Sequence, residues 1–433
     1  MTGTTPTPGR DGHAPSRPAG HPRRRRAALV VALGSAAALI GVAALAAGPD
    51  GQAGAHRSRD DLRLDWEARS SGVQVLGGDR EPGTPSVQRI RHDGVSFTVT
   101  VAPARPGPNL VRIDAARIRD GELVAHGSHR GKRAHTAWVG TNADFEAGDQ
   151  VRAEARPGAD GLWAVVDLPA GTATVLVSHG ARHRVPFAVD TGSESGGTET
   201  WTGPDGPECL TAATSSVLAG GAPPAACPAD ALDDADAAAL TATVRALGER
   251  GVRELAVQRD DSARSRAAHD LVRRVAATYD LRLVPATAPP GPRNALLVLS
   301  GWQDAATSLT RVTALPLRQQ PIRSDGTWLA PWLLSPGVVD STAGAVLPLD
   351  FDIRDARAQE FSQTLAALFP GQSPTSSGYV AWRAARDQQP DDVRLYAASR
   401  AAYMPAEPGH GSHGSEVAWF PGGTVTAVAA LTG

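Results

Sequence analysis

The chain has 433 residues, of which 41% are hydrophobic and 20% are charged, so it is long and apolar enough for two or three packed domains. This composition excludes a wholly disordered or collagen-like protein. The 43 basic residues nearly balance the 45 acidic ones, and the formal charge of -2 provides no global field that would favour nucleic acid as a partner.

The N-terminal region contains a basic cluster followed by an apolar run. Residues 1–26 are rich in Gly, Pro and Thr and end in four consecutive arginines, and residues 27–48 carry no charge. At about 1.5 Å rise per residue, the apolar run forms a helix of about 33 Å, which spans a hydrocarbon core of about 30 Å. Because positive charge is retained inside, we predict a disordered cytoplasmic tail at 1–26, a single transmembrane helix at 27–48 in the lipid bilayer of the cell membrane, and an extracytoplasmic remainder.

A cleaved signal peptide is the alternative for residues 27–48. Small residues flank the middle position at Ala44-Leu45-Ala46 and at Ala53-Gly54-Ala55, as cleavage requires. The apolar run is longer than the usual 7 to 15 residues of a signal peptide, which favours a retained anchor. Under the alternative the protein is secreted, and both hypotheses place the bulk of the chain outside the membrane.

Two cysteines, Cys209 and Cys227, fit this placement. An even pair in an oxidising compartment forms a structural disulfide more often than a metal site. Such a bridge would restrain the flexible Gly- and Pro-rich loop between the two cysteines. We therefore predict a disulfide between Cys209 and Cys227.

Residues 57–190 show the alternation of β-strands. In residues 95–101, apolar side chains alternate with Ser or Thr, which predicts a strand with one face in solvent. Further strands are predicted at 162–168, 172–178 and 185–189, separated by turns rich in Gly and Pro. Many short strands without a long helix predict a β-sandwich.

Three segments carry a resemblance to a known domain. They are the run Phe97–Val111, the later Gly161-Leu162-Trp163 and the closing residues Val185–Val189. Together they resemble the small immunoglobulin-like domain of bacterial copper-resistance membrane proteins. The resemblance implies an immunoglobulin-like β-sandwich for residues 57–190.

After a Gly-, Ser- and Thr-rich linker at 191–207, the periodicity becomes that of an α/β domain at 208–433. Helical spacing relates Ala237, Leu240, Val244 and Leu247, and also Leu271, Val272 and Val275. Short apolar runs at 254–258, 281–285 and 295–299 predict buried strands. Alternating helices and strands of this kind predict a Rossmann-like, three-layer domain with a mostly parallel sheet.

The α/β segment resembles a type I periplasmic solute-binding protein, the branched-chain amino-acid receptor of bacterial uptake systems. The resemblance rests on Gly251–Val257 with Asp260–Ser265, on Ala343–Val346 with Phe361, and on Pro374–Trp382, and it spans about 232–386. The roughly 230 residues after the linker are fewer than two full lobes require, so the resemblance implies a truncated receptor. It further implies a non-catalytic protein that binds a small-molecule ligand and serves a membrane transporter.

Candidate ligand contacts follow two predicted strands, because ligands of open α/β sheets bind at the carboxyl ends of the strands. The candidates are Asp261, Ser262, Ser265, Ser300, Gly301 and Trp302. The alternative is that the Asp and Ser residues are ordinary helix caps and that Trp302 is a packing residue.

A second hypothesis, from a different class, is a copper-binding accessory protein that hands metal to a membrane transporter. Met404, His410 and His413 lie in one Gly-rich segment, and thioether and imidazole groups together suit copper. The alternative is an exposed loop with two solvated histidines. Under the first hypothesis the protein requires no cofactor.

Motifs of enzymes are absent from the sequence. We find no nucleophile elbow, P-loop, dinucleotide fingerprint or HExxH motif. A secreted hydrolase remains a third hypothesis, because a fold brings together a Ser, a His and an acid from distant positions. We predict a binding protein and not an enzyme.

Overall fold

A computed structural model of the chain describes residues 72–77, 81–92, 94–119, 122–125, 137–141, 150–179, 183–194, 196–197, 199–224, 226–370, 372–400, 419 and 423–431. The predicted cytoplasmic tail and the apolar segment, residues 1–48, lie outside this part of the chain. Within it, no helix combines the length and the apolar character needed to cross a membrane.

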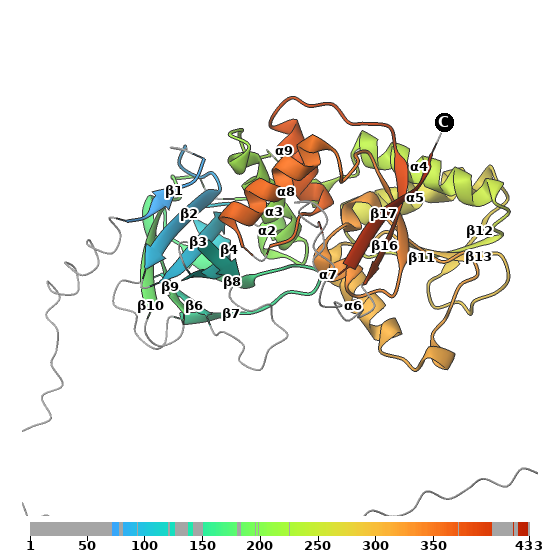
Figure 1. The fold of residues 1–433 in the computed structure, drawn as a ribbon, viewed down its shortest axis with the longest axis horizontal. Coiled ribbons are helices and arrows are strands. Elements are labelled where there is room, and N and C mark those ends of the chain that lie inside the picture. The colour runs from blue at the N-terminus through green and yellow to red at the C-terminus, as the bar shows by residue number, and fades with distance from the viewer. Residues whose placement is uncertain are drawn as a thin grey trace, which may run out of the picture. The chain divides into compact units, whose positions relative to one another are not determined.

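Two antiparallel sheets make up the N-terminal half of the described chain (Figure 1). The first has the order β1-β2-β3-β4-β5, with β8 also paired to β4, and the second has the order β10-β9-β6-β7. The strands are β1 (Gln74–Val75), β2 (Ser86–His92), β3 (Val95–Ala102), β4 (Gly107–Arg119), β5 (Glu122–Ala125), β6 (Ala137–Gly140), β7 (Gln150–Ala153), β8 (Leu162–Leu168), β9 (Thr172–His179) and β10 (His183–Asp190).

The two sheets share one hydrophobic core. Phe97 and Ile113 from the first sheet belong to the same buried cluster as Val139, Val175 and Phe187 from the second. The sheets therefore pack face to face, and the predicted strands at 162–168, 172–178 and 185–189 are confirmed within β8, β9 and β10. The specific likeness to an immunoglobulin-like domain stays a prediction.

The C-terminal half contains a seven-stranded mixed sheet of order β12-β11-β13-β14-β15-β16-β17. From β12 to β15 neighbouring strands are parallel, and β15, β16 and β17 are antiparallel, which confirms the predicted mixed α/β architecture. The strands are β11 (Glu254–Gln258), β12 (Arg282–Pro285), β13 (Asn294–Val298), β14 (Thr327–Leu329), β15 (Ala345–Leu349), β16 (Arg394–Arg400) and β17 (Gly423–Ala430).

Helices cover both faces of this sheet. From β11 the chain crosses to β12 on one side and then adds β13, β14 and β15 on the other, so right-handed crossovers place α5 and α6 on opposite faces. In Figure 1, α4 and α5 lie above the strands and α6 lies below them. The helices are α2 (Glu199–Thr202), α3 (Gly206–Leu218), α4 (Asp234–Glu249), α5 (Ala263–Ala277), α6 (Trp302–Thr313), α7 (Pro336–Val339), α8 (Ala356–Leu368) and α9 (Ser376–Ala384), with short 3₁₀ helices η1 (Pro228–Asp230), η2 (Leu317–Gln319) and η3 (Pro331–Leu333).

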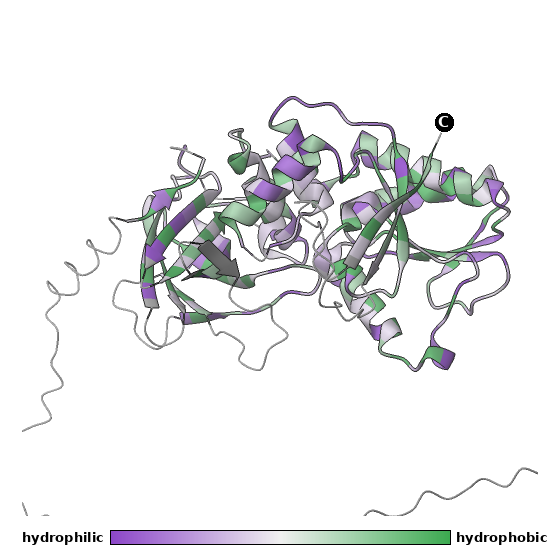
Figure 2. Ribbon diagram, viewed as in Figure 1, coloured by the Kyte–Doolittle hydropathy of each residue, from purple (hydrophilic) through white to green (hydrophobic). Residues whose placement is uncertain are grey.

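The helices of the α/β half bury the side chains that their spacing predicted. Leu240, Val244 and Leu247 of α4 and Val272 of α5 have no exposed surface. Figure 2 shows hydrophilic and apolar stretches alternating along α4 and α5, as expected for helices with one face on a core.

The segment predicted as a linker, residues 191–207, is buried at its two ends, whereas its described residues 193, 194, 196, 197 and 199 are exposed. It begins at Thr191, which is fully buried, and it contains α2. Leu210 of α3 shares an apolar cluster with Leu110 and Trp163 of the sandwich, and α3 also contacts α9. All described residues accordingly belong to one compact unit.

The prediction that Ser96, Thr98 and Thr100 of β3 face solvent is wrong, because all three are buried. The hydroxyl of Thr98 donates to the carbonyl of Leu368 in α8 at 3.2 Å, and Ser96 Oγ accepts from Arg89 Nε at 3.1 Å. This face packs on the helices of the other half of the unit. Alternation alone does not distinguish the two cases, since small hydroxyl side chains suit both water and a hydrogen-bonded interface.

The predicted disulfide between Cys209 and Cys227 is confirmed. It connects the buried first turn of α3 to the residue before η1 and closes the loop that contains Pro224. The described residues include no free cysteine.

Removal of this disulfide is expected to destabilise the protein. The double substitution Cys209→Ala/Cys227→Ala should lower the free energy of unfolding by about 3 kcal/mol, because the unfolded chain regains the entropy of a loop of this length. Chemical denaturation of the full chain, with and without a reducing agent, measures the loss. Equal stability of the oxidised wild type and the double variant would contradict this expectation.

Candidate functional site

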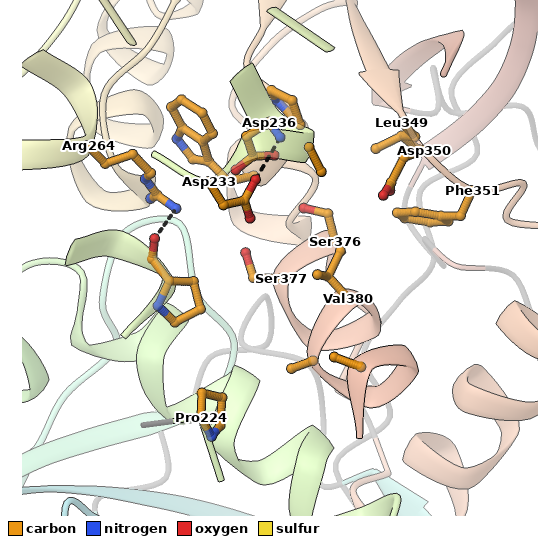
Figure 3. A pocket seen from close by; sticks show the side chains of 16 residues that line it. Pro224, Asp233, Asp236, Arg264, Leu349, Asp350, Phe351, Ser376, Ser377 and Val380 are labelled. Atoms are coloured by element: carbon orange, nitrogen blue, oxygen red, sulfur yellow. Dashed lines mark hydrogen bonds between the residues drawn. The ribbon is translucent and has the colours of Figure 1, made fainter. Parts of the chain in front are cut away.

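A pocket of about 240 Å³ opens at the carboxyl end of β15, next to η3, which follows β14 (Figure 3). This is the edge of a parallel sheet at which ligands of α/β proteins bind. The pocket is lined by Pro224, Pro228, Asp233, Ala235, Asp236, Arg264, Pro331, Trp332, Leu349, Asp350, Phe351, Ser376, Ser377, Val380, Ala381 and Ala384.

Three helices begin at the pocket. Asp233 caps α4 and accepts the amide of Asp236 at 2.7 Å, a bond drawn in Figure 3. Ser262 caps α5, and Thr375 caps α9, where its hydroxyl accepts the amide of Gly378 at 3.0 Å. Each cap accepts an amide at the positive end of its helix, so the protein itself satisfies part of these N-termini and holds the three helix ends in place around the pocket.

Aromatic side chains form the apolar walls. Trp332 is held from two sides, because its Nε1 donates to the carbonyl of Ser300 at 3.0 Å and its carbonyl accepts from Trp302 Nε1 at 2.7 Å. Phe351 packs against Tyr379 of α9 with ring centroids 4.6 Å apart. Both rings are therefore fixed in place before any ligand arrives.

A buried ion pair lies behind the pocket. Both nitrogens at the end of Arg264 bond to Glu208, at 2.8 and 2.6 Å, and the two side chains are 2% and 0% exposed. Ser377 Oγ donates to the same carboxylate at 2.6 Å, and the guanidinium of Arg264 stacks over Trp332 at 4.4 Å. Burial alone would lower the pKa of Arg264, but Glu208 above all outweighs it, and the pKa of Arg264 is raised.

Two carboxyl groups near this pair are hard to ionise. Burial first, and the Asp233 carboxylate second, raise the pKa of Asp236 to about 8. Burial and the charge of Glu208 raise the pKa of Asp205 to about 7. Arg264 thus lies near three acidic side chains, Glu208, Asp236 and Asp205, and its single charge neutralises only one of them. With a pKa of about 8, Asp236 is mostly protonated at neutral pH.

Asp350, also at the pocket, is already paired. Its carboxylate accepts from Arg383 at 2.5 Å, and its carbonyl accepts from the same guanidinium at 3.1 Å. Arg383 is buried and lies in α9, so this pair fastens α9 to the end of β15. The pocket wall formed by α9 is held by charge as well as by apolar packing.

Among the residues that line the pocket, Ser376 has a buried polar atom that no other described residue satisfies. It is 3% exposed, and its hydroxyl is buried without a hydrogen-bond partner among the described residues. In Figure 3 this hydroxyl points toward the side of the pocket that carries Asp233. A buried hydroxyl without a partner costs free energy, and a ligand that bonds to it recovers that cost.

Of the sequence-predicted residues after β11, Ser262 caps α5 and the other two bond to nearby residues of the same loop. Asp261 is 96% exposed and pairs with Arg259 at 3.3 Å. Ser262 Oγ accepts the amide of Ser265, and Ser265 Oγ accepts the amide of Asp260. The capping alternative therefore accounts for Ser262, and local contacts account for Asp261 and Ser265.

The sequence-predicted residues after β13 also bond within the protein. Ser300 is fully buried and its Oγ accepts from Gln258 Nε2 at 3.2 Å, while Trp302 supports Trp332. The amide of Gly301 donates to Asp260 at 2.6 Å, which helps to lower the pKa of Asp260 although its burial acts to raise it. None of the six predicted residues lines the described pocket, and their contact with a ligand stays a prediction.

Gly301 has a steric role instead. A Cβ at this position would lie 1.9 Å from Oδ1 of Asp205, so only glycine leaves room for that carboxyl group. The carboxyl group of Asp205 accordingly occupies the crevice between β11 and β13, where the strand order reverses.

The proposed copper ligands Met404, His410 and His413 lie outside the described residues. Within the described part of the chain, no group of three or more His, Cys, Asp and Glu side chains is placed to hold a metal ion. Copper binding stays a prediction.

Sequence reasoning missed Glu208, Asp236 and the roles of Arg264 and Ser376. The resembling segments contain Arg264 and Ser376, but the resemblance alone does not assign them to a pocket. Glu208 is a single acid among apolar and small residues of α3, which is a signal for a buried, paired charge.

No protein-family model matches the chain, and no curated protein matches it. Parts of the chain are similar to solved structures at low TM-scores. A solute-binding protein of an ABC transporter from Rhodopseudomonas palustris BisB5, in complex with 3,4-dihydroxybenzoic acid, has a TM-score of 0.31 and 12% identity over 45% of this chain and 64% of that one. A branched-chain amino acid ABC transporter periplasmic ligand-binding protein from Burkholderia xenovorans LB400 has a TM-score of 0.30 and 11% identity over 45% and 63%.

A third similar structure is an ABC transporter substrate-binding protein from Desulfitobacterium hafniense in complex with Leu, with a TM-score of 0.25 and 14% identity over 35% of this chain and 47% of that one. The chain thus spans between 47% and 64% of the length of these three proteins. All three of these proteins are solute-binding proteins of ABC transporters.

Proposed function

We propose that this chain is a non-catalytic binding protein whose pocket at the carboxyl end of β15 takes a small molecule with an ammonium group. The observation that carries the proposal is an excess of carboxyl groups in an otherwise apolar pocket. Arg264 is neutralised by Glu208, and Asp350 by Arg383, whereas Asp233 and Asp236 have no cationic partner in hydrogen-bond contact among the described residues. A cation is the charge that this lining lacks.

The walls determine the rest of the ligand. A volume of about 240 Å³ bounded by Trp332, Phe351 and Val380 suits one aromatic ring or a branched aliphatic chain. The unpartnered hydroxyl of Ser376 supplies one further hydrogen bond. The ligand class is therefore a compact apolar amine.

The placement outside the cell is part of the proposal. Four arginines before the apolar residues 27–48 support a membrane anchor with the pocket on the extracytoplasmic side. The disulfide supports an oxidising compartment. A receptor tethered in this way serves a membrane transporter as its partner.

A matched series of probes tests the ligand class. Titration calorimetry of the full chain with phenethylamine, 2-phenylethanol and 3-phenylpropionate compares a cation, a neutral molecule and an anion of similar size. We expect phenethylamine to bind at least about tenfold more tightly than the alcohol, because only it forms an ion pair with Asp236, and the acid to show no binding. Its affinity should rise by up to about tenfold per pH unit until pH reaches about 8, because Asp236 must release its proton.

Two substitutions locate the site. Asp236→Asn should abolish the preference for phenethylamine, while Asp261→Asn, on a side chain that is 96% exposed, should leave it unchanged. The reverse result would place the ligand at the loop after β11. Equal affinity for all three probes would reject the ammonium class.

A further inference from the structure

Large apolar side chains are exposed together at one place on the α/β half. Among the described residues, six large hydrophobic side chains are exposed, and three of them lie between α6 and β14. Leu315 is 39% exposed, Leu317 is 77% exposed and Ile322 is 70% exposed. We call residues 314–322 the apolar tip. It is the orange segment that extends below and to the right of α6 in Figure 1, and Figure 2 shows apolar stretches along it.

The apolar tip is held in its outward conformation by its own hydrogen bonds. The side-chain amide of Gln320 donates to the carbonyls of Thr313 and Leu315, at 3.3 and 2.9 Å. At the base, buried Arg323 donates to Asn294 Oδ1 at 2.7 Å and to the carbonyl of Ala288 at 2.7 Å. Gln320 and Arg323 thus bond inward to the protein, while Leu317 and Ile322 stay in water. Exposure of these side chains costs hydrophobic free energy that insertion into an apolar phase would recover.

The charged residues within and next to the tip are basic, and the nearest acidic residues in the sequence are Asp304 and Asp325. From Ala305 to Ser324 the sequence contains three arginines and no Asp or Glu. Arg311 and Arg318 are exposed, on either side of Leu315. A basic residue near an anionic membrane surface contributes about 1 kcal/mol of attraction. Acidic phospholipid headgroups therefore complement this segment, and a cationic surface does not.

We propose that the apolar tip inserts Leu317 and Ile322 into the interface of an anionic lipid bilayer, with Arg311 and Arg318 on the headgroups. A stable protein partner would need about 800 Å² of this surface, far more than three projecting side chains provide. Insertion of an apolar tip between basic residues needs no larger area. This inference does not depend on the pocket or on its ligand.

The test uses the full chain reconstituted into vesicles, where a local probe reports the depth of one residue. Both natural cysteines are in the disulfide, so Leu317→Cys provides a single thiol for an environment-sensitive nitrobenzoxadiazole label. Val428→Cys, on an exposed strand residue outside the tip, is the matched control. Quenching by aqueous iodide measures exposure to water, and quenching by brominated acyl chains measures contact with lipid.

In vesicles that contain phosphatidylglycerol, we expect iodide quenching of the label at 317 to fall about threefold and brominated lipid to quench it, with no change at 428. Arg311→Gln/Arg318→Gln should reverse both effects. Equal iodide quenching in phosphatidylglycerol and pure phosphatidylcholine vesicles would overturn the proposal. Protection from iodide without quenching by brominated lipid would also overturn it, since a protein surface would then cover the tip.

Discussion

Arg264→Met is expected to lower the free energy of unfolding by about 3–5 kcal/mol, because it leaves the Glu208 carboxylate buried without a cation. Glu208 is 0% exposed, and the hydroxyl of Ser377 would then be its remaining side-chain partner among the described residues. Chemical denaturation of the full chain measures the loss. The same substitution should also weaken the packing of Trp332, over whose ring Arg264 lies.

Two further variants separate loss of charge pairing from loss of packing. The double substitution Glu208→Gln/Arg264→Met should recover most of the stability, because no unpaired charge remains buried. Glu360→Gln, which breaks the exposed pair between Glu360 and Arg386, should cost no more than about 1 kcal/mol. A similar loss from Glu360→Gln and Arg264→Met would show that burial of the Glu208–Arg264 pair has no energetic effect.

The free energy of unfolding is also expected to depend strongly on pH, because of the buried carboxyl group of Asp236. Burial raises its pKa from the ordinary 3.8 to about 8, so between about pH 4 and pH 8 the folded protein holds a proton that the unfolded chain releases. Stability from this group is therefore full below pH 4 and is lost as pH rises toward 8. Asn cannot release a proton, and Asp236→Asn should gain on the order of 2 kcal/mol relative to wild type between pH 5 and pH 8.

Thermal and chemical unfolding of both proteins at several pH values measures this difference. Asp205→Asn should show the same sign over a window that ends near pH 7, because burial and Glu208 raise the pKa of Asp205 to about 7. Asp261→Asn, on an exposed side chain, should show no pH-dependent difference. A constant difference between Asp236→Asn and wild type from pH 5 to pH 8 would mean that Asp236 is ionised throughout.

Local periodicity predicted several of the described strands and helices. The apolar runs at 254–258 and 162–168 are β11 and β8 at the same bounds, and the helical spacing of Leu240 and Val244 lies within α4. These predictions succeed because burial leaves a pattern in the sequence: an element with one buried face shows a period of apolar residues, and β11, buried on both faces, shows a continuous apolar run. The disulfide was predictable for a different reason, since only one pairing of two cysteines exists.

The pocket was not predictable in the same way. The rule that ligands bind at the carboxyl ends of strands led to β11 and β13, where Asp260 bonds to Gly301 and Asp205 occupies the crevice. The pocket lies farther along the same edge, at β15. The rule selects an edge of the sheet, and side-chain packing selects the place along that edge.

By itself, the sequence determined several strands and two helices, the mixed α/β architecture of the C-terminal half and the pairing of the two cysteines. Only the tertiary structure decided that Ser96 and Thr98 are buried, that Arg264 bonds to Glu208 56 positions away, and that Ser377 reaches the same carboxylate across 169 positions. The physical reason is that a periodic pattern reports whether a side chain is covered or wet. It does not report which distant group covers it, and that choice sets the pKa of Asp236 and the lining of the pocket.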